Sequence, residues 1–266
     1  YDLESAVMKG HQKSSIGNDV ILHYIRQDYP EPKTFADFVY LSQVMQGQGI
    51  ALGLRAHRAA APYCMGTLYW QLNDAWPAVS WSSIDYYGAW KALHYQTKRA
   101  FEPIILVPDT AKGKVLIAHD PLPNSVNAVL EVSIYDFSGN LHREISHQPV
   151  CLDYALSVET LPMPDCVLGL DQETARRSYI HYRLIEQATG RELAFFVDYA
   201  AKVKDLDLMP AASYTLCHWK SDEGYTVELY SGILLKDVYI DTGSPDWHVS
   251  DNFFDALPGQ TYRLQI

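Results

Sequence analysis

The stretch that most constrains this chain is residues 62–95, where large aromatic side chains and carboxylates lie close together in the sequence. It holds four of the six tryptophans and two aspartates, namely Trp70, Trp76, Trp81, Trp90, Asp74 and Asp85. Flat aromatic faces beside groups that bond hydroxyls are typical of a surface that binds a sugar. We therefore interpret this stretch as a candidate carbohydrate site.

Composition narrows the partners that such a site can have. Apolar residues make up 48% of the 266 residues, which allows one large domain or two to three modules with a sizeable core. The formal net charge of −11, without a cluster of Lys and Arg, opposes binding to nucleic acid or to a membrane surface.

No segment approaches the roughly 18 to 20 apolar residues of a membrane span. The chain begins YDLESAV, without Met or a signal peptide, which indicates an excised piece and assigns no compartment.

Metal, cofactor and common hydrolase motifs are absent from the sequence. The four cysteines have no CxxC spacing and predict free, mostly buried thiols rather than a zinc site or disulfides: Cys64, Cys151, Cys166 and Cys217. Three histidines, His11, His57 and His94, lack metal-ligand spacing with one another. No GxSxG, P-loop or HExxH motif occurs. We expect no metal and no cofactor.

The first hundred residues have an α/β pattern. One helix is predicted to end before Pro30, and a second to open at Thr34, where Thr34 and Asp37 form a capping-box variant, and to extend toward residue 60. Glycines within this second helix predict close packing or a break near Gly49. Residues 64–72 are almost continuously apolar after a proline, which predicts a strand buried on both faces of a parallel sheet. A loop over 73–88 and a helix over 89–100 follow.

After Pro103 the pattern changes to short alternating segments, which predict a β-sandwich. The expected strands are 114–119, 128–135, 141–145, 154–161, 179–185 and 192–197. A polar segment over 200–210 is predicted to be a linker. A further group of strands follows, but it is shorter than the seven strands of a complete sandwich.

The candidate site residues can be weighed individually. Trp70 lies where the predicted strand ends and polarity rises, as at the ligand-facing end of a parallel α/β barrel, so we interpret it as ligand-facing. Asp74 has two open interpretations: a group that bonds a sugar hydroxyl or an arginine, or a loop residue that satisfies backbone amides. Asp85 is predicted to cap or brace the loop rather than to pair with Asp74 as a catalytic acid. For Trp76 and Trp81, contacts with neighbouring loops or with sugars stay open; Trp90 is predicted to be core.

A run of motifs resembles family 2 glycoside hydrolases of the β-mannosidase branch. The central one is MGTLYWQLND over 65–74, followed by Trp76-Pro77 and by SWSSIDYYG over 80–88. The similarity also covers HQK at 11–13, QGQG at 46–49, AHR at 56–58, WKALHY at 90–95 and SDNFF at 250–254. It is strong through residue 103 and weaker beyond.

The resemblance implies an architecture for the whole chain. Residues 1–103 would be the C-terminal part of a (β/α)8 TIM barrel, 104–207 a β-sandwich domain of immunoglobulin-like type, and 208–266 a second, truncated C-terminal β-sandwich. The fold class implied is thus α/β plus β. The partners implied are a β-mannoside oligosaccharide or glycoside and the upstream barrel and N-terminal domains of the parent protein.

The resemblance also implies the chemistry. Such enzymes are retaining and use two glutamates whose carboxyl groups lie about 5 to 5.5 Å apart. In the family one follows an Asn and the other a Ser, and this chain contains neither an Asn-Glu nor a Ser-Glu pair. We therefore expect no catalytic residue here and no activity from the chain alone. The residues carried over are substrate-binding: Trp70, as the apolar wall of the subsite for the terminal mannose, and Asp74 as its neighbour.

Two alternatives remain. The parent protein could have another family 2 specificity, such as β-galactosidase, β-glucuronidase or exo-β-glucosaminidase activity. The chain could instead be a non-catalytic module that binds glycans or braces the barrel.

Overall fold

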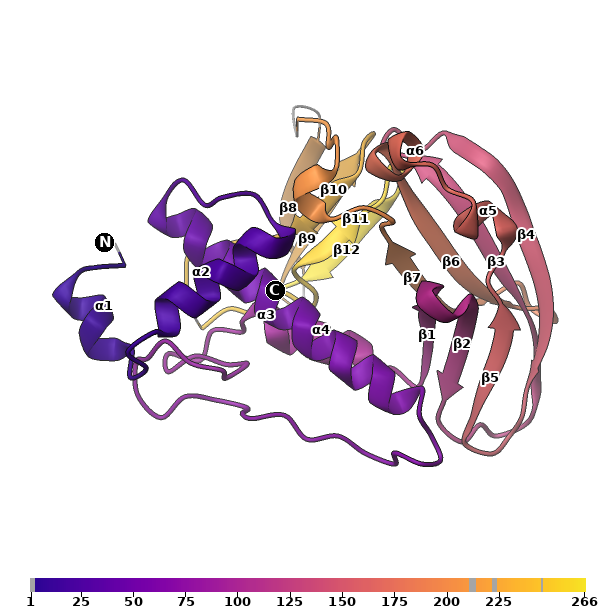
Figure 1. Ribbon diagram of the computed structural model, residues 1–266, viewed down its shortest axis with the longest axis horizontal. Helices are drawn as coiled ribbons and strands as arrows, with labels where there is room; N and C mark the ends of the chain where they lie inside the picture. Colours follow the sequence, from indigo (N-terminus) through magenta and orange to yellow (C-terminus); the bar gives the residue numbers. More distant parts are fainter. Residues whose placement is uncertain (1–2, 211–213, 222–223, 245) are drawn as a thin grey trace.

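A computed structural model describes residues 3–210, 214–221, 224–244 and 246–266. Its parts follow one another along the chain: a group of helices with a long loop, a β-sandwich, and a second, smaller arrangement of strands (Figure 1). Within these described ranges, no helix combines the length and the apolar character needed to cross a membrane.

The helices of the first part are α1 (Ala6–His11), α2 (Gly17–Asp28), α3 (Phe35–Arg58) and α4 (Ala92–Ala100). The predicted capping box is present: Thr34 accepts a hydrogen bond from the Asp37 amide, and the Asp37 carboxylate accepts one from the Thr34 amide. α3 runs without a break through its glycines. At Gly47 an added Cβ would lie 3.1 Å from Gln96 and 3.2 Å from the backbone of Ala92, so the close packing of α3 on α4 explains this glycine.

The segment between α3 and α4 corrects two predictions. Residues 64–72 form no strand: they pair with no strand of the described chain, and Leu68 is 99% exposed. A buried strand needs neighbouring strands that take up its backbone groups, and none of the described strands pairs with this segment. The last helix starts at Ala92 rather than at residue 89. The barrel part of the expected fold class is therefore not shown in residues 3–103.

The β-sandwich after Pro103 consists of two antiparallel sheets. One has the order β1-β2-β5, built from β1 (Ile104–Asp109), β2 (Lys114–His119) and β5 (Ser157–Pro162). The other has the order β4-β3-β6-β7, built from β4 (Leu141–Leu152), β3 (Val126–Asp136), β6 (Ser178–Glu186) and β7 (Glu192–Asp198). Short helices, α5 (Asp165–Leu168) and α6 (Gln172–Arg177), lie between β5 and β6. All six predicted strands are confirmed, and β1 was missed.

The core of this sandwich lies between its two sheets. Its fully buried members come from both sheets, with Leu106, Val115 and Ile117 on one side and Leu130, Val132, Ile134, Tyr182 and Leu184 on the other. Inward positions alternate along β3, which is the period expected of a strand with one buried face. The predicted sandwich is thus built on a continuous apolar layer.

The C-terminal strands are β8 (Tyr214–Ser221), β9 (Gly224–Ser231), β10 (Leu235–Val238), β11 (Phe254–Ala256) and β12 (Thr261–Gln265). They form a three-stranded sheet, β12-β9-β8, and a two-stranded sheet, β10-β11. A small apolar core lies between them, made by Val227, Leu229, Val249, Phe254, Ala256 and Leu264. We call this part the smaller sandwich.

The smaller sandwich is anchored to the helices through residues 249–253. Phe253 lies in the same buried cluster as Phe38 of α3 and Tyr95 of α4. The Arg99 guanidinium forms an ion pair with Asp251 and donates a hydrogen bond to the Phe253 carbonyl at 2.7 Å. The SDNFF motif therefore serves as the contact between parts of the chain that are far apart in sequence.

The cysteines are free, as predicted, but not mostly buried. Cys151 and Cys217 are exposed, and Cys64 and Cys166 are partly buried. Along β4, Cys151 comes directly before the buried Leu152, so its thiol lies on the opposite, outer face of the sheet. Cys217 lies in β8, where residues 214–220 are all exposed.

Candidate functional site

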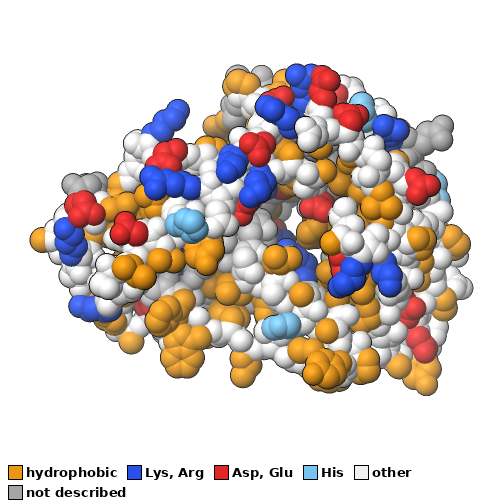
Figure 2. Space-filling view, in the orientation of Figure 1, with side chains coloured by type: hydrophobic (Ala, Val, Ile, Leu, Met, Phe, Trp, Pro, Cys, Tyr) orange, Lys and Arg blue, Asp and Glu red, His pale blue; other side chains and the backbone are white. Residues whose placement is uncertain are grey.

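Trp70 lies on an irregular loop and presents its indole to solvent. Its side chain is 73% exposed, and Tyr63, Met65 and Leu72 around it are exposed as well. The peptide bond between Trp70 and Gln71 is cis. Figure 2 shows hydrophobic side chains protruding along the lower edge of the molecule, where the loop between α3 and α4 runs in Figure 1. A large aromatic face is thus available next to the polar residues that follow it.

Asp74, four residues later, is only 7% exposed and sits at the centre of a hydrogen-bonded cluster. The Ser80 hydroxyl donates to its Oδ1 at 2.7 Å, and the Ser82 hydroxyl donates to its Oδ2 at 2.5 Å. The Lys91 ammonium lies 3.3 Å from Oδ2 and also donates to the Ser82 hydroxyl at 2.8 Å. We call Asp74, Ser80, Ser82 and Lys91 the Asp74 cluster.

The ionisation of Asp74 follows from these contacts. Burial alone would raise the pKa of its carboxyl, but the hydrogen bonds from Ser80 and Ser82 and the nearby Lys91 ammonium outweigh burial. The pKa of Asp74 therefore lies below its ordinary value. The carboxylate is charged at neutral pH and its lone pairs point into the loop.

Backbone hydrogen bonds complete the rigid part of the loop. The Ser83 amide donates to the Gln71 carbonyl at 3.0 Å, and the Ile84 amide donates to the Leu72 carbonyl at 2.8 Å. The Lys91 amide in turn donates to the Ser83 carbonyl at 2.9 Å. The backbone directly after Trp70 is therefore tied to the residues that lead into α4.

Asp85 braces the loop, as predicted. Its Oδ1 accepts hydrogen bonds from the Tyr87 amide at 2.8 Å and from the Ala89 amide at 2.9 Å. This is an Asp side chain that stabilises a turn, and both bonds go to the backbone. Asp74 and Asp85 thus have separate sets of partners.

The first helix contacts the same loop through His11. Its Nδ1 lies 2.6 Å from the Pro77 carbonyl oxygen, and its ring stacks on Trp76 with ring centroids 5.6 Å apart. The Lys13 ammonium lies 5.1 Å from the Trp76 ring centroid. Of the two alternatives for Trp76, the structure shows a contact with a neighbouring part of the chain. The HQK motif therefore has a structural role.

The other two tryptophans differ from each other. Trp90 is half-buried beside α4, where it stacks on His248 with centroids 4.8 Å apart and contacts His94 at 4.4 Å. Burial lowers the pKa of His94, so its imidazole is neutral at pH 7. Trp81 is exposed. Trp90 was predicted to be a core residue on a helix; it packs against the buried cluster that contains Tyr95 and Phe253, but it is only partly buried and precedes α4.

The partners of Asp74 are not among the residues predicted from the sequence to form the site. Ser80, Ser82 and Lys91 were part of the motifs but had no assigned role. A signal was available: two serines spaced to face the same side of an extended segment, and one lysine within a loop otherwise poor in positive charge.

The described residues offer no catalytic pair or metal centre in this part. Glu4 and Glu31 pair with Lys9 and Arg26 at the helix surface, and Glu102 follows α4. Across the described ranges no three His, Cys, Asp or Glu side chains come together in a way that could hold a metal ion.

The comparisons with known sequences match this chain to beta-mannosidases. Residues 212–266 match the family model Ig_mannosidase, described as an Ig-fold domain. The chain is 29% identical to a beta-mannosidase of Bos taurus over 257 residues, which cover 90% of the chain and 29% of the relative. It is 32% identical to beta-mannosidase B of Aspergillus terreus over 283 residues, which cover 99% of the chain and 33% of the relative.

Among solved structures, the chain resembles a beta-D-mannosidase from Dictyoglomus thermophilum with a TM-score of 0.79 and 24% identity. The match covers 99% of this chain and 32% of that chain. The likeness in structure shows a shared fold. The chain therefore spans about a third of the length of the proteins that it matches.

Proposed function

From the premise that this chain is the C-terminal portion of a family 2 glycoside hydrolase of the β-mannosidase branch, we propose that the intact protein is an exo-acting retaining β-mannosidase. Matches to named beta-mannosidases over 90% and 99% of the chain support this proposal. The substrate would be a glycoside or oligosaccharide with a terminal, non-reducing β-D-mannose.

Within that protein, residues 1–103 would be the last part of the (β/α)8 barrel, 104–207 a β-sandwich and 208–266 a second C-terminal sandwich. The observation that carries the proposal is the exposed apolar run that leads to Trp70, directly followed by the buried Asp74 cluster. A fully exposed Leu68 and an exposed Trp70 are unfavourable in water, and strands supplied by upstream residues would cover one side of this run.

In this arrangement the chain contributes a wall of the sugar pocket. The indole of Trp70 would stack on the mannose ring, where it buries the sugar's CH groups and favours the positive charge that develops on the ring in an oxocarbenium-like transition state. Asp74 would lie next to Trp70 in the wall of the sugar pocket. Because its oxygens already accept from Ser80, Ser82 and Lys91, its main contribution would be to hold the backbone after Trp70 in place.

The reacting carboxyl groups would come from upstream of this chain. A general acid/base glutamate and a nucleophilic glutamate would form and hydrolyse a glycosyl-enzyme intermediate. The absence of Asn-Glu and Ser-Glu pairs in the sequence supports this division. The 266-residue chain alone would therefore bind sugar weakly and turn over no substrate.

Hydrolysis of aryl glycosides tests the proposal. We expect the intact protein to release the aryl group from an aryl β-mannoside and the isolated chain to release none. Aryl β-galactoside, β-glucuronide and β-glucosaminide, assayed in parallel, should be poorer substrates. Faster hydrolysis of one of these three by the intact protein would reassign the specificity, and inhibitor-sensitive hydrolysis by the isolated chain would contradict the division of residues.

A further inference from the structure

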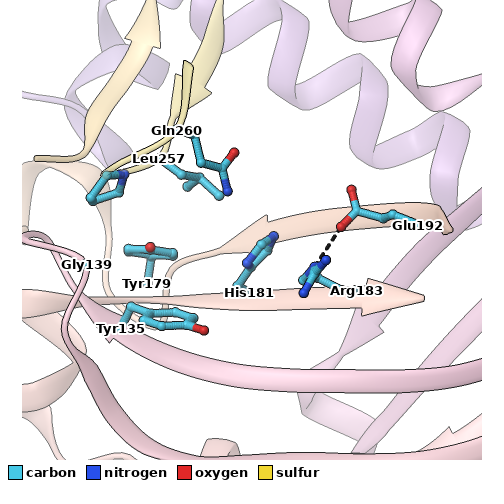
Figure 3. Close-up of a pocket in the computed structure, with 9 residues that line it drawn as sticks. Tyr135, Gly139, Tyr179, His181, Arg183, Glu192, Leu257 and Gln260 are labelled. Carbon is cyan, nitrogen blue, oxygen red and sulfur yellow. Dashed lines mark hydrogen bonds and ion pairs between the residues drawn. The ribbon is translucent and has the colours of Figure 1, made fainter. Parts of the chain in front are cut away.

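A cavity of about 540 Å³ lies between the two sandwiches, away from the loop that carries Trp70. Its floor is the outer face of the sheet β4-β3-β6-β7, with Tyr135 from β3, and Tyr179, His181 and Arg183 from β6. Its roof is the turn between β11 and β12, residues 257–260. Figure 3 shows the side chains of Tyr179 and His181 facing the space below Leu257 and Gln260. This size lies within the ~300–1,000 Å³ range of sites for small molecules.

Two polar side chains of the floor face the cavity. Tyr179 is 3% exposed and His181 is 8% exposed. In the part of the chain that the structure describes, their contacts are ring contacts, and neither the Tyr179 hydroxyl nor a ring nitrogen of His181 meets a hydrogen-bond partner. Within the described residues, the enclosed side-chain atoms that lack a partner are the Thr97 hydroxyl and Nε2 of His119, so the polar atoms of Tyr179 and His181 are open to the cavity. They can therefore bond a ligand that enters it.

The chemistry of the lining selects a neutral, polar ligand with an apolar face. Tyr135 stacks on Tyr179 with ring centroids 5.6 Å apart and planes at 23°, which provides a flat aromatic surface. Arg183 is the cation of the lining, and its charge is already matched by Glu192 at 2.7 Å and Glu131 at 3.3 Å. An anionic ligand would therefore find no free positive charge there.

The protonation state of His181 adds to this selection. Burial, with a smaller effect of Arg183, lowers the pKa of His181 to about 4. At neutral pH the imidazole therefore has one nitrogen that donates and one that accepts. Hydroxyl groups of a sugar can do both, and so can the hydroxyl of Tyr179.

We propose that this cavity is a second carbohydrate site, which binds a neutral pyranose unit of an oligosaccharide through the Tyr179 hydroxyl and the His181 imidazole, with the Tyr135 ring against the sugar. Gln260 closes the site from the roof. None of its lining residues belongs to residues 62–91, which carry Trp70 and the Asp74 cluster. It would hold part of a longer glycan while another part is processed.

Calorimetry on the intact protein tests this site. The probe is a thio-linked mannotriose, whose glycosidic sulfur resists hydrolysis, and Trp70→Ala serves as the background so that binding at the catalytic pocket is weakened. We expect binding to remain in Trp70→Ala. Adding Tyr179→Phe, which keeps the ring and its packing, should weaken it about three- to tenfold, as loss of one hydrogen bond does. Adding Tyr135→Ala should weaken it more.

The matched control is Tyr154→Phe, which removes an exposed hydroxyl that does not line the cavity and should leave binding unchanged. Loss of all binding in Trp70→Ala, or equal affinity of the Tyr179→Phe and Tyr154→Phe proteins, would overturn the second site. Hydrolysis of an aryl β-mannoside by the wild-type protein reports on the proposed function separately. If the protein hydrolyses this substrate but shows a single sugar-binding site, the proposed β-mannosidase function stands and the second site is refuted.

Discussion

The ammonium nitrogen of Lys91 lies 3.3 Å from Oδ2 of Asp74, and this largely buried ion pair joins the backbone after Trp70 to the residue that precedes α4. The lysine is the N-cap of the helix and the aspartate the centre of the loop. A change at either position should therefore be felt at Trp70, although neither side chain touches it.

Removal of the Lys91 charge should loosen this loop. In Lys91→Met the Asp74 carboxylate keeps two hydroxyl donors but loses its counter-charge, and breaking a buried pair costs about 3 kcal/mol. Hydrogen exchange of the Ser83 and Ile84 amides in the intact protein should become faster, and the KM for an aryl β-mannoside should rise. The control is Arg26→Met, which breaks an exposed pair with Glu31 and should leave the exchange of these amides unchanged. Equal exchange in both variants would show that the pair does not hold the loop.

A second buried ionic group joins the smaller sandwich to α3. The Lys236 ammonium lies 3.0 Å from Asp237 and 3.5 Å from Asp255, and Tyr199 donates to Asp255 at 2.7 Å. The side chain of Gln48 in α3 donates to Asp237 at 3.5 Å. The two carboxylates hold the pKa of Lys236 above its ordinary value in spite of burial.

Lys236→Met should therefore destabilise the chain strongly, because it leaves two buried carboxylates without a counter-charge. We expect the free energy of unfolding to fall by about 3 to 5 kcal/mol, measured by urea denaturation of the 266-residue chain. Lys112→Met, which breaks an exposed pair with Asp109, should leave the free energy of unfolding nearly unchanged. A Lys236→Met chain as stable as Lys112→Met would contradict the role of this group.

His181 should make stability depend on pH. Its pKa is about 4 in the folded chain and 6.5 when exposed, so the unfolded state binds more protons between these values. The free energy of unfolding therefore does not depend on His181 protonation above about pH 6.5. It decreases as the pH falls toward 4, by about 3 kcal/mol in total. The difference in unfolding free energy between wild type and His181→Gln should therefore shrink from pH 7 to pH 5. A constant difference would show that the imidazole titrates normally.

The β part of the fold was predictable from sequence for a physical reason. In β3, buried side chains alternate with partly exposed ones from Ala128 to Val132, and this period of two is visible in the sequence without knowledge of the partners. β1 was missed because Pro108 lies in it, and proline marks a strand as an edge or a loop. Here β1 is indeed an edge strand, paired with β2 alone.

The segment 64–72 could not be judged from its own residues. An apolar run predicts burial, but burial depends on neighbouring strands, and none of the described strands pairs with this run. Asp74 is a different case. The sequence identified it as a candidate site residue, but its role depends on which of several nearby donors bond its carboxylate. Sequence proximity does not fix such geometry, since Ser80, Ser82 and Lys91 meet the carboxylate only when the loop folds back.

The most direct measurement of the central claim is kcat/KM for an aryl β-mannoside in the intact protein carrying Trp70→Ala. If Trp70 is a wall of the mannose subsite, kcat/KM should fall by about 10- to 100-fold, as loss of a stacking face against a developing positive charge implies. Trp219→Ala, which removes a partly exposed tryptophan from β8 in the smaller sandwich, is the control and should stay near wild type. A Trp70→Ala protein with the same kcat/KM as the Trp219→Ala control would contradict the account.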